Sequence, residues 1–181
     1  MTDNLSMYLN MYTPATDEEQ RHYTEQLRVL FRELQAKGED CLTEALLEEA
    51  AVVSSCLSQE WPKEVGRVLD TVRAYLAGHA TLANLSIARD RLASRLTGTV
   101  AVGGVEEARW QYQWACANFV RVETDKDQPY FVAKALCACL FHWPDGYDEA
   151  EAQCRQLARL RAALENRLSD GNRLRVSLLA D

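Results

Sequence analysis

The amino-acid sequence predicts an all-α protein, a single-domain bundle of about seven helices with a central buried helix pair. Glycine and proline are scarce, with eight and four residues among 181, which argues against a turn-rich β protein. Apolar residues recur at helical spacing along most of the chain. A chain of this length that is 48% hydrophobic buries enough surface to fold without a disulfide or a metal.

The chain is expected to begin with an irregular arm, residues 1–15, which lacks a sustained period. The sequence TDEE that follows matches a capping box, in which the Thr16 hydroxyl accepts the backbone N–H of Glu19 and the Glu19 carboxylate reaches back. The first helix is then expected to end at Gly38, where a C-terminal cap fits. A second helix is expected to start near Asp40.

Proline and glycine delimit the next two helices. The third is expected to begin at Trp61-Pro62, with the proline in its first turn, and to end at Gly78. The fourth is expected to end near Gly98. The sequence TGTVAVGGVEE predicts a loop, and its glycine pair does not match a phosphate-binding loop because no Lys-Ser or Lys-Thr follows.

The fifth and sixth helices are expected to form the central buried pair. The fifth spans about residues 106–122 and is apolar on two faces, as is usual for a helix in the middle of a fold. The sixth starts at Pro129 and ends before Pro144, and it carries few polar residues. A seventh helix, over about residues 148–168, is expected to turn Cys154 and its leucines inward.

The main helical core is expected to span residues 67–170, with a tail over residues 171–181. The end of the chain, RLRVSLLAD, alternates weakly between polar and apolar residues, which predicts a short strand or a docked tail. No fixed-period internal repeat is present. All of these parts are assigned to one domain, residues 1–181.

The net charge of −7 is concentrated in the N-terminal third. Residues 1–66 contain 13 acidic and five basic residues, whereas residues 67–181 contain 14 acidic and 15 basic residues. Residues 16–66 are therefore an acidic helical third of the domain. A net-acidic chain without a basic cluster is not typical of nucleic-acid-binding proteins, so no nucleic acid is expected among its partners.

The sequence also predicts a cytoplasmic protein that does not enter a membrane. Its start, MTDNLSMYLNMYTP, lacks the basic residues and the apolar run of a signal peptide. The longest apolar stretch, YFVAKALCACLFHW, is interrupted by a lysine and is too short to span a bilayer. The six cysteines are accordingly expected to be free thiols.

Catalytic and metal-binding patterns point away from an enzyme. Cys137, Cys139 and His142 are close in sequence, but a Cys-x-Cys pair within a helix turns its thiols to nearly opposite sides, unlike a structural zinc site. Buried core cysteines are the preferred interpretation. No histidine stands in a catalytic motif, and neither a Gly-x-Ser-x-Gly elbow nor a Glu-x-x-His pattern occurs. No catalytic residue, metal or cofactor is expected.

Aromatic residues of the fifth helix allow two interpretations. Trp110 and Trp114 are one helical turn apart, and core packing is the simpler explanation. The alternative is a docking surface or a ligand pocket, since tryptophan is favoured at binding hot spots. Such a pocket would be lined by Trp110, Trp114 and Trp143.

The most unusual stretch is EDCLTEALLEE, Glu39 to Glu49. It contains five carboxylates, and no lysine or arginine lies between Lys37 and Lys63. One interpretation is a solvated helix face that aids solubility. The other is an acidic face held ready for a basic partner, because such faces steer association and raise its rate.

The spacing of these carboxylates favours a shared face. Asp40, Glu44 and Glu48 recur every four residues, and each like-charged pair disfavours the helix by about 0.2–0.5 kcal/mol. Residues that lower stability without a local gain are expected at binding surfaces. The predicted partner-binding residues are Asp40, Glu44, Glu48 and Glu49.

Residues 60–165 resemble a known family. The segments VLDTVRAYLAG, ARWQYQWACANFV and YFVAKALCACLFHWP follow one another in an order and an alanine-rich texture similar to those of all-α immunity proteins of bacterial polymorphic-toxin systems, the family numbered five. The resemblance implies a small, non-enzymatic protein that binds and blocks a cognate toxin delivered by a contact-dependent or type VI secretion route. A monomer or a homodimer is expected.

A toxin that acts in the cytoplasm is often a nuclease with a basic substrate-binding surface, and an acidic face is able to occupy such a surface as a mimic of phosphate. Two other functions stay open. One is a helical adaptor or chaperone for a secreted client, which an exposed aromatic fifth helix would favour. The other is a protein that binds a small molecule.

Overall fold

The structure is a computed structural model. It describes residues 15–178 except residues 39, 58–59, 99–102, 120–127 and 143–147, and for residues 168–178 the description is of the backbone. Residues 1–14 of the predicted N-terminal arm and Trp143 lie outside the described residues. The described part contains seven helices and no strand, which confirms the all-α single-domain prediction: α2 (Asp17–Gln35), α3 (Cys41–Leu57), α4 (Lys63–Leu76), α5 (Leu82–Leu96), α6 (Gly104–Asn118), α7 (Gln128–His142) and α8 (Glu149–Leu178).

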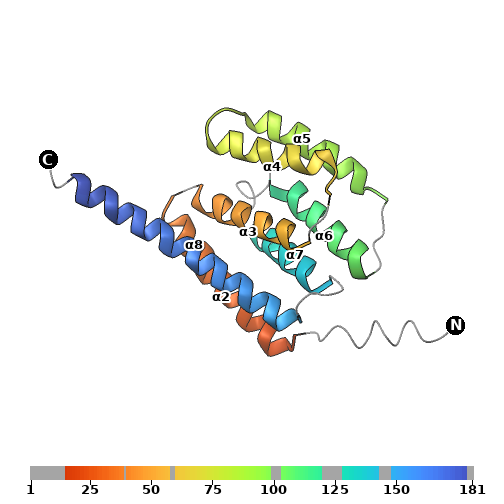
Figure 1. Ribbon diagram of the computed structural model, residues 1–181, viewed down its shortest axis with the longest axis horizontal. Coiled ribbons are helices and arrows are strands. Elements are labelled where there is room, and N and C mark those ends of the chain that lie inside the picture. The colour runs from red at the N-terminus through yellow and green to blue at the C-terminus, as the bar shows by residue number, and fades with distance from the viewer. Residues whose placement is uncertain are drawn as a thin grey trace.

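The helices form three layers (Figure 1). α2 and α8 lie side by side on one side of the molecule, and α4 and α5 form a helical hairpin on the opposite side. α3, α6 and α7 lie between these two pairs, and the contact between α6 and α7 is the most extensive in the molecule. Among the described residues, no helix is both long and apolar enough to cross a membrane.

The middle layer holds most of the core. α7 and α3 are buried on more than one side, whereas α6 buries one face and leaves another partly open. The acidic third shares this core, because Leu27 and Leu34 of α2 and Leu42 and Leu46 of α3 are at most 1% exposed and belong to the same apolar cluster as Leu136. Burial of such leucines is worth about 1.5–3 kcal/mol each.

Local sequence signals set several helix ends as expected, but Gly38 does not cap α2, whose C-cap is Ala36. Thr16 and Glu19 form the predicted capping box, with Glu19 N–H bonded to Thr16 Oγ1 at 3.2 Å and Thr16 N–H bonded to Glu19 Oε2 at 2.7 Å. The bonds to Thr16 lower the pKa of Glu19. At the end of α4, Gly78 has φ 72°, and the backbone N–H of His79 bonds to Ala74 O at 2.7 Å. This is the left-handed glycine cap that a helix end requires.

Two expectations about the chain are wrong. α6 begins at Gly104, so part of the predicted loop is helical. α8 continues to Leu178, so RLRVSL is neither a strand nor a docked tail, and the helix extends past the end of α2 (dark blue in Figure 1). A six-residue alternation is too short to overrule an adjoining helix, because extending a helix costs far less than nucleating one.

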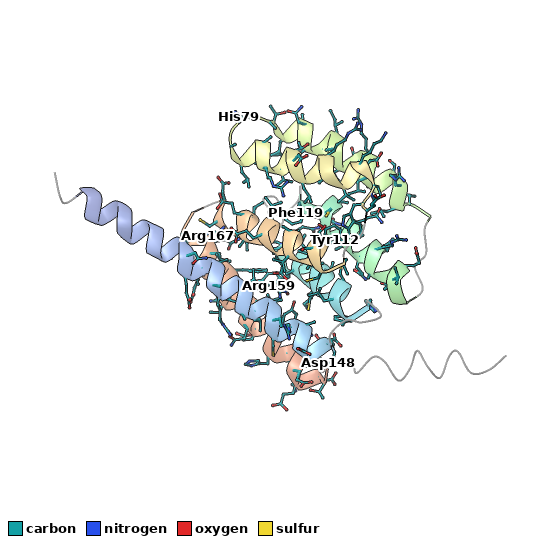
Figure 2. The ribbon with its side chains drawn as sticks, in the orientation of Figure 1. His79, Tyr112, Phe119, Asp148, Arg159 and Arg167 are labelled. Atoms are coloured by element: carbon teal, nitrogen blue, oxygen red, sulfur yellow. The ribbon has the colours of Figure 1, made fainter. Side chains whose placement is uncertain are left out.

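A buried tyrosine joins two helices of the middle layer. Tyr112 of α6 is 1% exposed and donates its hydroxyl to Ala50 O of α3 at 3.0 Å. Its ring stacks on Trp61, with ring centroids 4.2 Å apart, and Trp61 Nε1 donates to Ser54 Oγ at 2.8 Å. Figure 2 shows Tyr112 in the middle of the molecule. The hydroxyl is thus paired at a place where no water reaches it.

We expect Tyr112→Phe to lower the free energy of unfolding by about 1 kcal/mol, because it keeps the stacked ring but removes the buried hydrogen bond to Ala50 O. Chemical denaturation checks this value. Thr71→Val is the matched control, since its hydroxyl bonds to Arg67 O where water has access, and it should change stability by less than about 0.5 kcal/mol. Equal stability of Tyr112→Phe and the wild type would contradict the prediction.

Candidate functional site

The buried carboxylate of α3 is paired within the molecule. The side chain of Glu49 is 1% exposed. Arg159 of α8 binds it with two hydrogen bonds, Nε to Oε2 at 2.7 Å and Nη2 to Oε1 at 2.6 Å. This bidentate geometry is the strong form of a carboxylate–guanidinium pair. The hydrogen bond with Glu49 raises the pKa of Arg159, and this effect outweighs burial, which lowers it.

A fully buried amide extends this pair into a network. Gln156 of α8 donates Nε2 to Ala133 O of α7 at 2.9 Å and to Glu49 Oε1 at 3.3 Å. Its Oε1 accepts the hydroxyl of Tyr23 from α2. Burial is the main cause that raises the pKa of Tyr23 well above its usual value, so its hydroxyl stays a donor. The network therefore links four helices through hydrogen bonds.

The exposed carboxylates of α3 also find a partner on α8. Arg167 Nη2 lies 2.9 Å from Glu48 Oε1 and 3.3 Å from Glu44 Oε2. Its side chain is 15% exposed. Burial lowers the pKa of Arg167, but the bond to Glu48 and the charges of both glutamates raise it, and the net shift is upward. Figure 2 shows Arg159 and Arg167 on α8 where it passes α3.

These pairs revise the predicted partner-binding face. Asp40, Glu44 and Glu48 are exposed, so a face that a partner can reach remains. Glu49 does not belong to it, because it is buried and held by Arg159. Binding of a partner at the three exposed carboxylates stays a prediction.

Sequence reasoning missed these pairs because the partners are far apart in the chain. Glu49 and Arg159 are separated by 110 residues, and Glu44 and Arg167 by 123. A count of charges along the sequence does not show which distant residues form ion pairs. One signal was present: Arg159 and Arg167 are eight residues apart and so share one helix face, as the glutamates of α3 do.

A groove of about 410 Å³ lies along α7. Phe131, Lys134, Ala138 and Phe141 line it from α7. One wall comes from Trp110, Gln111 and Trp114 of α6, and the other from α2 and the start of α8, with Gln20, Tyr23, Glu149 and Gln153. This volume is within the range of sites that hold drug-sized ligands or large side chains.

The aromatic groups of the groove are only partly covered. Trp110 and Trp114 are half-buried and stack with ring centroids 6.3 Å apart and planes at 24°. Phe131 is 54% exposed. The docking-surface interpretation of Trp110 and Trp114 thus has a groove to support it. The exposed Phe131 was not expected, because its helix was predicted to be buried throughout.

Some polar groups of the groove have hydrogen-bond or ion-pair partners in the described part of the protein, and others do not. Glu149 Oε2 accepts the backbone N–H of Ala15 at 2.8 Å, and its Oε1 accepts from Gln20 Nε2. Trp110 Nε1 is buried and has no acceptor among the described residues. Lys134 is exposed, and no carboxylate of the described residues lies within 4.0 Å of its ammonium. Among the described residues, the exposed group of the groove that lacks an oppositely charged partner is therefore the Lys134 ammonium, whereas the Trp110 N–H is unpaired but covered.

Cysteines and histidines do not assemble into a site. Cys116, Cys137 and Cys139 are buried, and burial raises the pKa of both Cys116 and Cys137 to about 12. His22 and His79 are exposed on different helices or turns, whereas His142 is half-buried, and burial lowers its pKa. Within the part of the chain that the structure describes, no three His, Cys, Asp or Glu side chains are placed to hold a metal ion.

One cysteine expectation is wrong. Cys154 is exposed rather than inward, because the buried stripe of α8 runs through Gln153, Gln156, Leu157 and Leu160. A helix face about 100° wide set by those four residues leaves position 154 outside.

Removing Arg159 should cost more than removing the charge of Glu49. Arg159→Met strands a buried carboxylate and is expected to lower the free energy of unfolding by about 3–5 kcal/mol. Glu49→Gln leaves a guanidinium that is 29% exposed and able to reach water, so its cost should be about 1–3 kcal/mol. Denaturant titration of both variants and of Arg155→Met, an arginine in an exposed pair, measures this order. The reverse order would contradict it.

Thiol reactivity should divide the cysteines into two groups. Cys56 and Cys154 are exposed and should react with a disulfide reagent at pH 8 within minutes. Cys116, Cys137 and Cys139 should stay protected until the protein unfolds, because the thiolate is the reactive form and burial suppresses it. Counting modified sites by mass spectrometry with and without denaturant tests this division. Rapid labelling of Cys137 in the native protein would refute it.

The chain matches no protein-family model, no curated protein and no solved structure. The resemblance of residues 60–165 to immunity proteins therefore stays a prediction, and the functional inference depends on the geometry of the groove and of the acidic face.

Proposed function

We propose that the protein is an immunity protein, acting in the cytoplasm, that binds a cognate toxin effector and neutralises it in a stoichiometric complex. The observation that carries the proposal is where the family-like segments lie. ARWQYQWACANFV supplies the α6 wall of the groove, and YFVAKALCACLFHWP supplies its α7 floor. The segments that resemble the family are therefore also those that form an accessible aromatic surface.

The properties of this surface suit protein binding. Half-buried tryptophans and an exposed phenylalanine beside a groove are the type of anchor that contributes most to interface affinity. The groove is carried by packed helices, and the Glu49–Arg159–Gln156 network holds α8 against α3 and α7. A surface on such a rigid body loses little entropy on binding, which favours a tight complex.

The acidic face takes a secondary role in this proposal. Asp40, Glu44 and Glu48 are exposed, but Arg167 pairs with two of these carboxylates and offsets one of the three negative charges. Such a face steers a basic toxin, for instance a nuclease delivered by type VI secretion, and mainly affects the association rate.

A second function, that of a helical adaptor or chaperone for a secreted client, is favoured by the same half-exposed Trp110 and Trp114. An adaptor and an immunity protein differ in what their partner does alone. The client of an adaptor is harmless in the cytoplasm, whereas a toxin is not.

Co-expression should separate these functions. The product of the reading frame next to the gene is expected to arrest growth alone, and this protein should restore growth and co-purify with it in a fixed ratio. The control is Arg159→Met, whose expected loss of stability should weaken the rescue at raised temperature. A harmless neighbour that still co-purifies would favour the adaptor. A harmless neighbour that does not co-purify would count against both functions.

The acidic face has its own test. Joint substitution of Asp40→Asn, Glu44→Gln and Glu48→Gln should slow association with the toxin several-fold at low salt and leave the dissociation rate nearly unchanged. Surface plasmon resonance at two ionic strengths measures both rates. An unchanged association rate would show that the face does not steer the partner.

A further inference from the structure

The floor of the groove is a segment of α7 about 15 Å long, because Phe131 and Phe141 are ten positions apart and each position adds about 1.5 Å. Phe131 and Phe141 stand at its two ends, and Ala135 and Ala138 occupy its middle. Aromatic side chains at the ends and methyl groups between them leave a hollow along the helix. A hollow of this length accommodates about three turns of another helix.

The walls add both shape and chemistry. Trp110 and Trp114 present stacked rings on one side, and the amides of Gln20 and Gln153 lie on the other. An exposed aromatic floor with polar rims is typical of a protein-docking groove rather than a closed ligand cavity. The exposed ring of Phe131 lies at one end of the floor, where an incoming apolar side chain can cover it.

The charge of the groove selects the occupant. Lys134 is the one cation among the described lining residues, and no ion pair with a described carboxylate neutralises it. Glu149 also lines the groove and keeps its negative charge, but both of its carboxylate oxygens already accept hydrogen bonds, from Ala15 and Gln20. The exposed ammonium of Lys134 is therefore the group of the groove that complements an anionic acceptor.

We propose that the groove receives a short amphipathic helix of the partner, which places a carboxylate at Lys134 and apolar side chains between Phe131 and Phe141. The proposal rests on the proposed function, since the partner is the cognate toxin, and it adds the surface and the chemistry of recognition. The toxin is basic where the acidic face meets it and carries a local acidic residue where it enters the groove.

Variants at Lys134 test the contact in the complex with the product of the neighbouring reading frame. Lys134→Met keeps the apolar stem and removes the charge, and it should weaken affinity about tenfold. Lys134→Arg should retain most of the affinity. The matched control is Lys63→Met, an exposed lysine of α4 that does not line the groove, and it should bind as the wild type does. Isothermal titration calorimetry at two salt concentrations measures each value.

The shape of the groove is tested separately. Phe131→Ala removes an exposed ring and should leave the melting temperature nearly unchanged while it weakens binding about tenfold or more. Overlapping 15-residue peptides that tile the toxin serve as the second probe. One helical peptide with an acidic residue should bind the wild type and lose affinity for Lys134→Met.

The outcomes distinguish the two proposals. Failure of any complex to form would overturn the immunity function and this inference with it. A tight complex that is indifferent to Lys134→Met and Phe131→Ala would overturn the groove contact alone and leave immunity intact. A wild-type dimer that Lys134→Met dissociates would show that a second copy of the chain occupies the groove, which also overturns the inference.

Discussion

The buried pair of Glu49 and Arg159 is the interaction on which the arrangement of the helices depends. A carboxylate that is 1% exposed is tolerated only because a guanidinium meets both of its oxygens. This ion pair fixes α8 against α3. The hydrogen bonds of Gln156 connect α8 to α7 as well and, through Tyr23, to α2. Apolar packing tolerates small displacements of one helix along another. A bidentate ion pair does not, so this network sets the register of the central and outer layers.

The same network positions the two surfaces that matter for function. α8 passes α3 on one side, where Arg167 meets Glu44 and Glu48, and its first turns border the groove on the other. The acidic face and the aromatic groove are thus carried by one rigid arrangement of α3, α7 and α8. A partner that contacts both surfaces would meet them at a fixed spacing, which favours specificity over adaptability.

Sequence reasoning succeeded where the cause is local. The capping box at Thr16, the glycine cap at Gly78 and the helical class depend on residues within one or two turns, and all were predicted. It failed where the cause lies elsewhere in the chain. The partners of the glutamates come from a helix more than 100 residues later, and the exposure of Phe131 depends on which helices border α7. The groove was anticipated only in part, through Trp110 and Trp114, because periodicity shows that a face is apolar and not what covers it.

The separation of Glu49 from Arg159 also has a consequence for how the protein is made. Arg159 follows Glu49 by 110 positions, which a ribosome translates in roughly 5–20 s at 5–20 residues per second. Until α8 has been synthesised, Glu49 lacks its guanidinium partner and α3 lacks the helix that carries it. The nascent chain therefore completes this part of its core only once α8 is available.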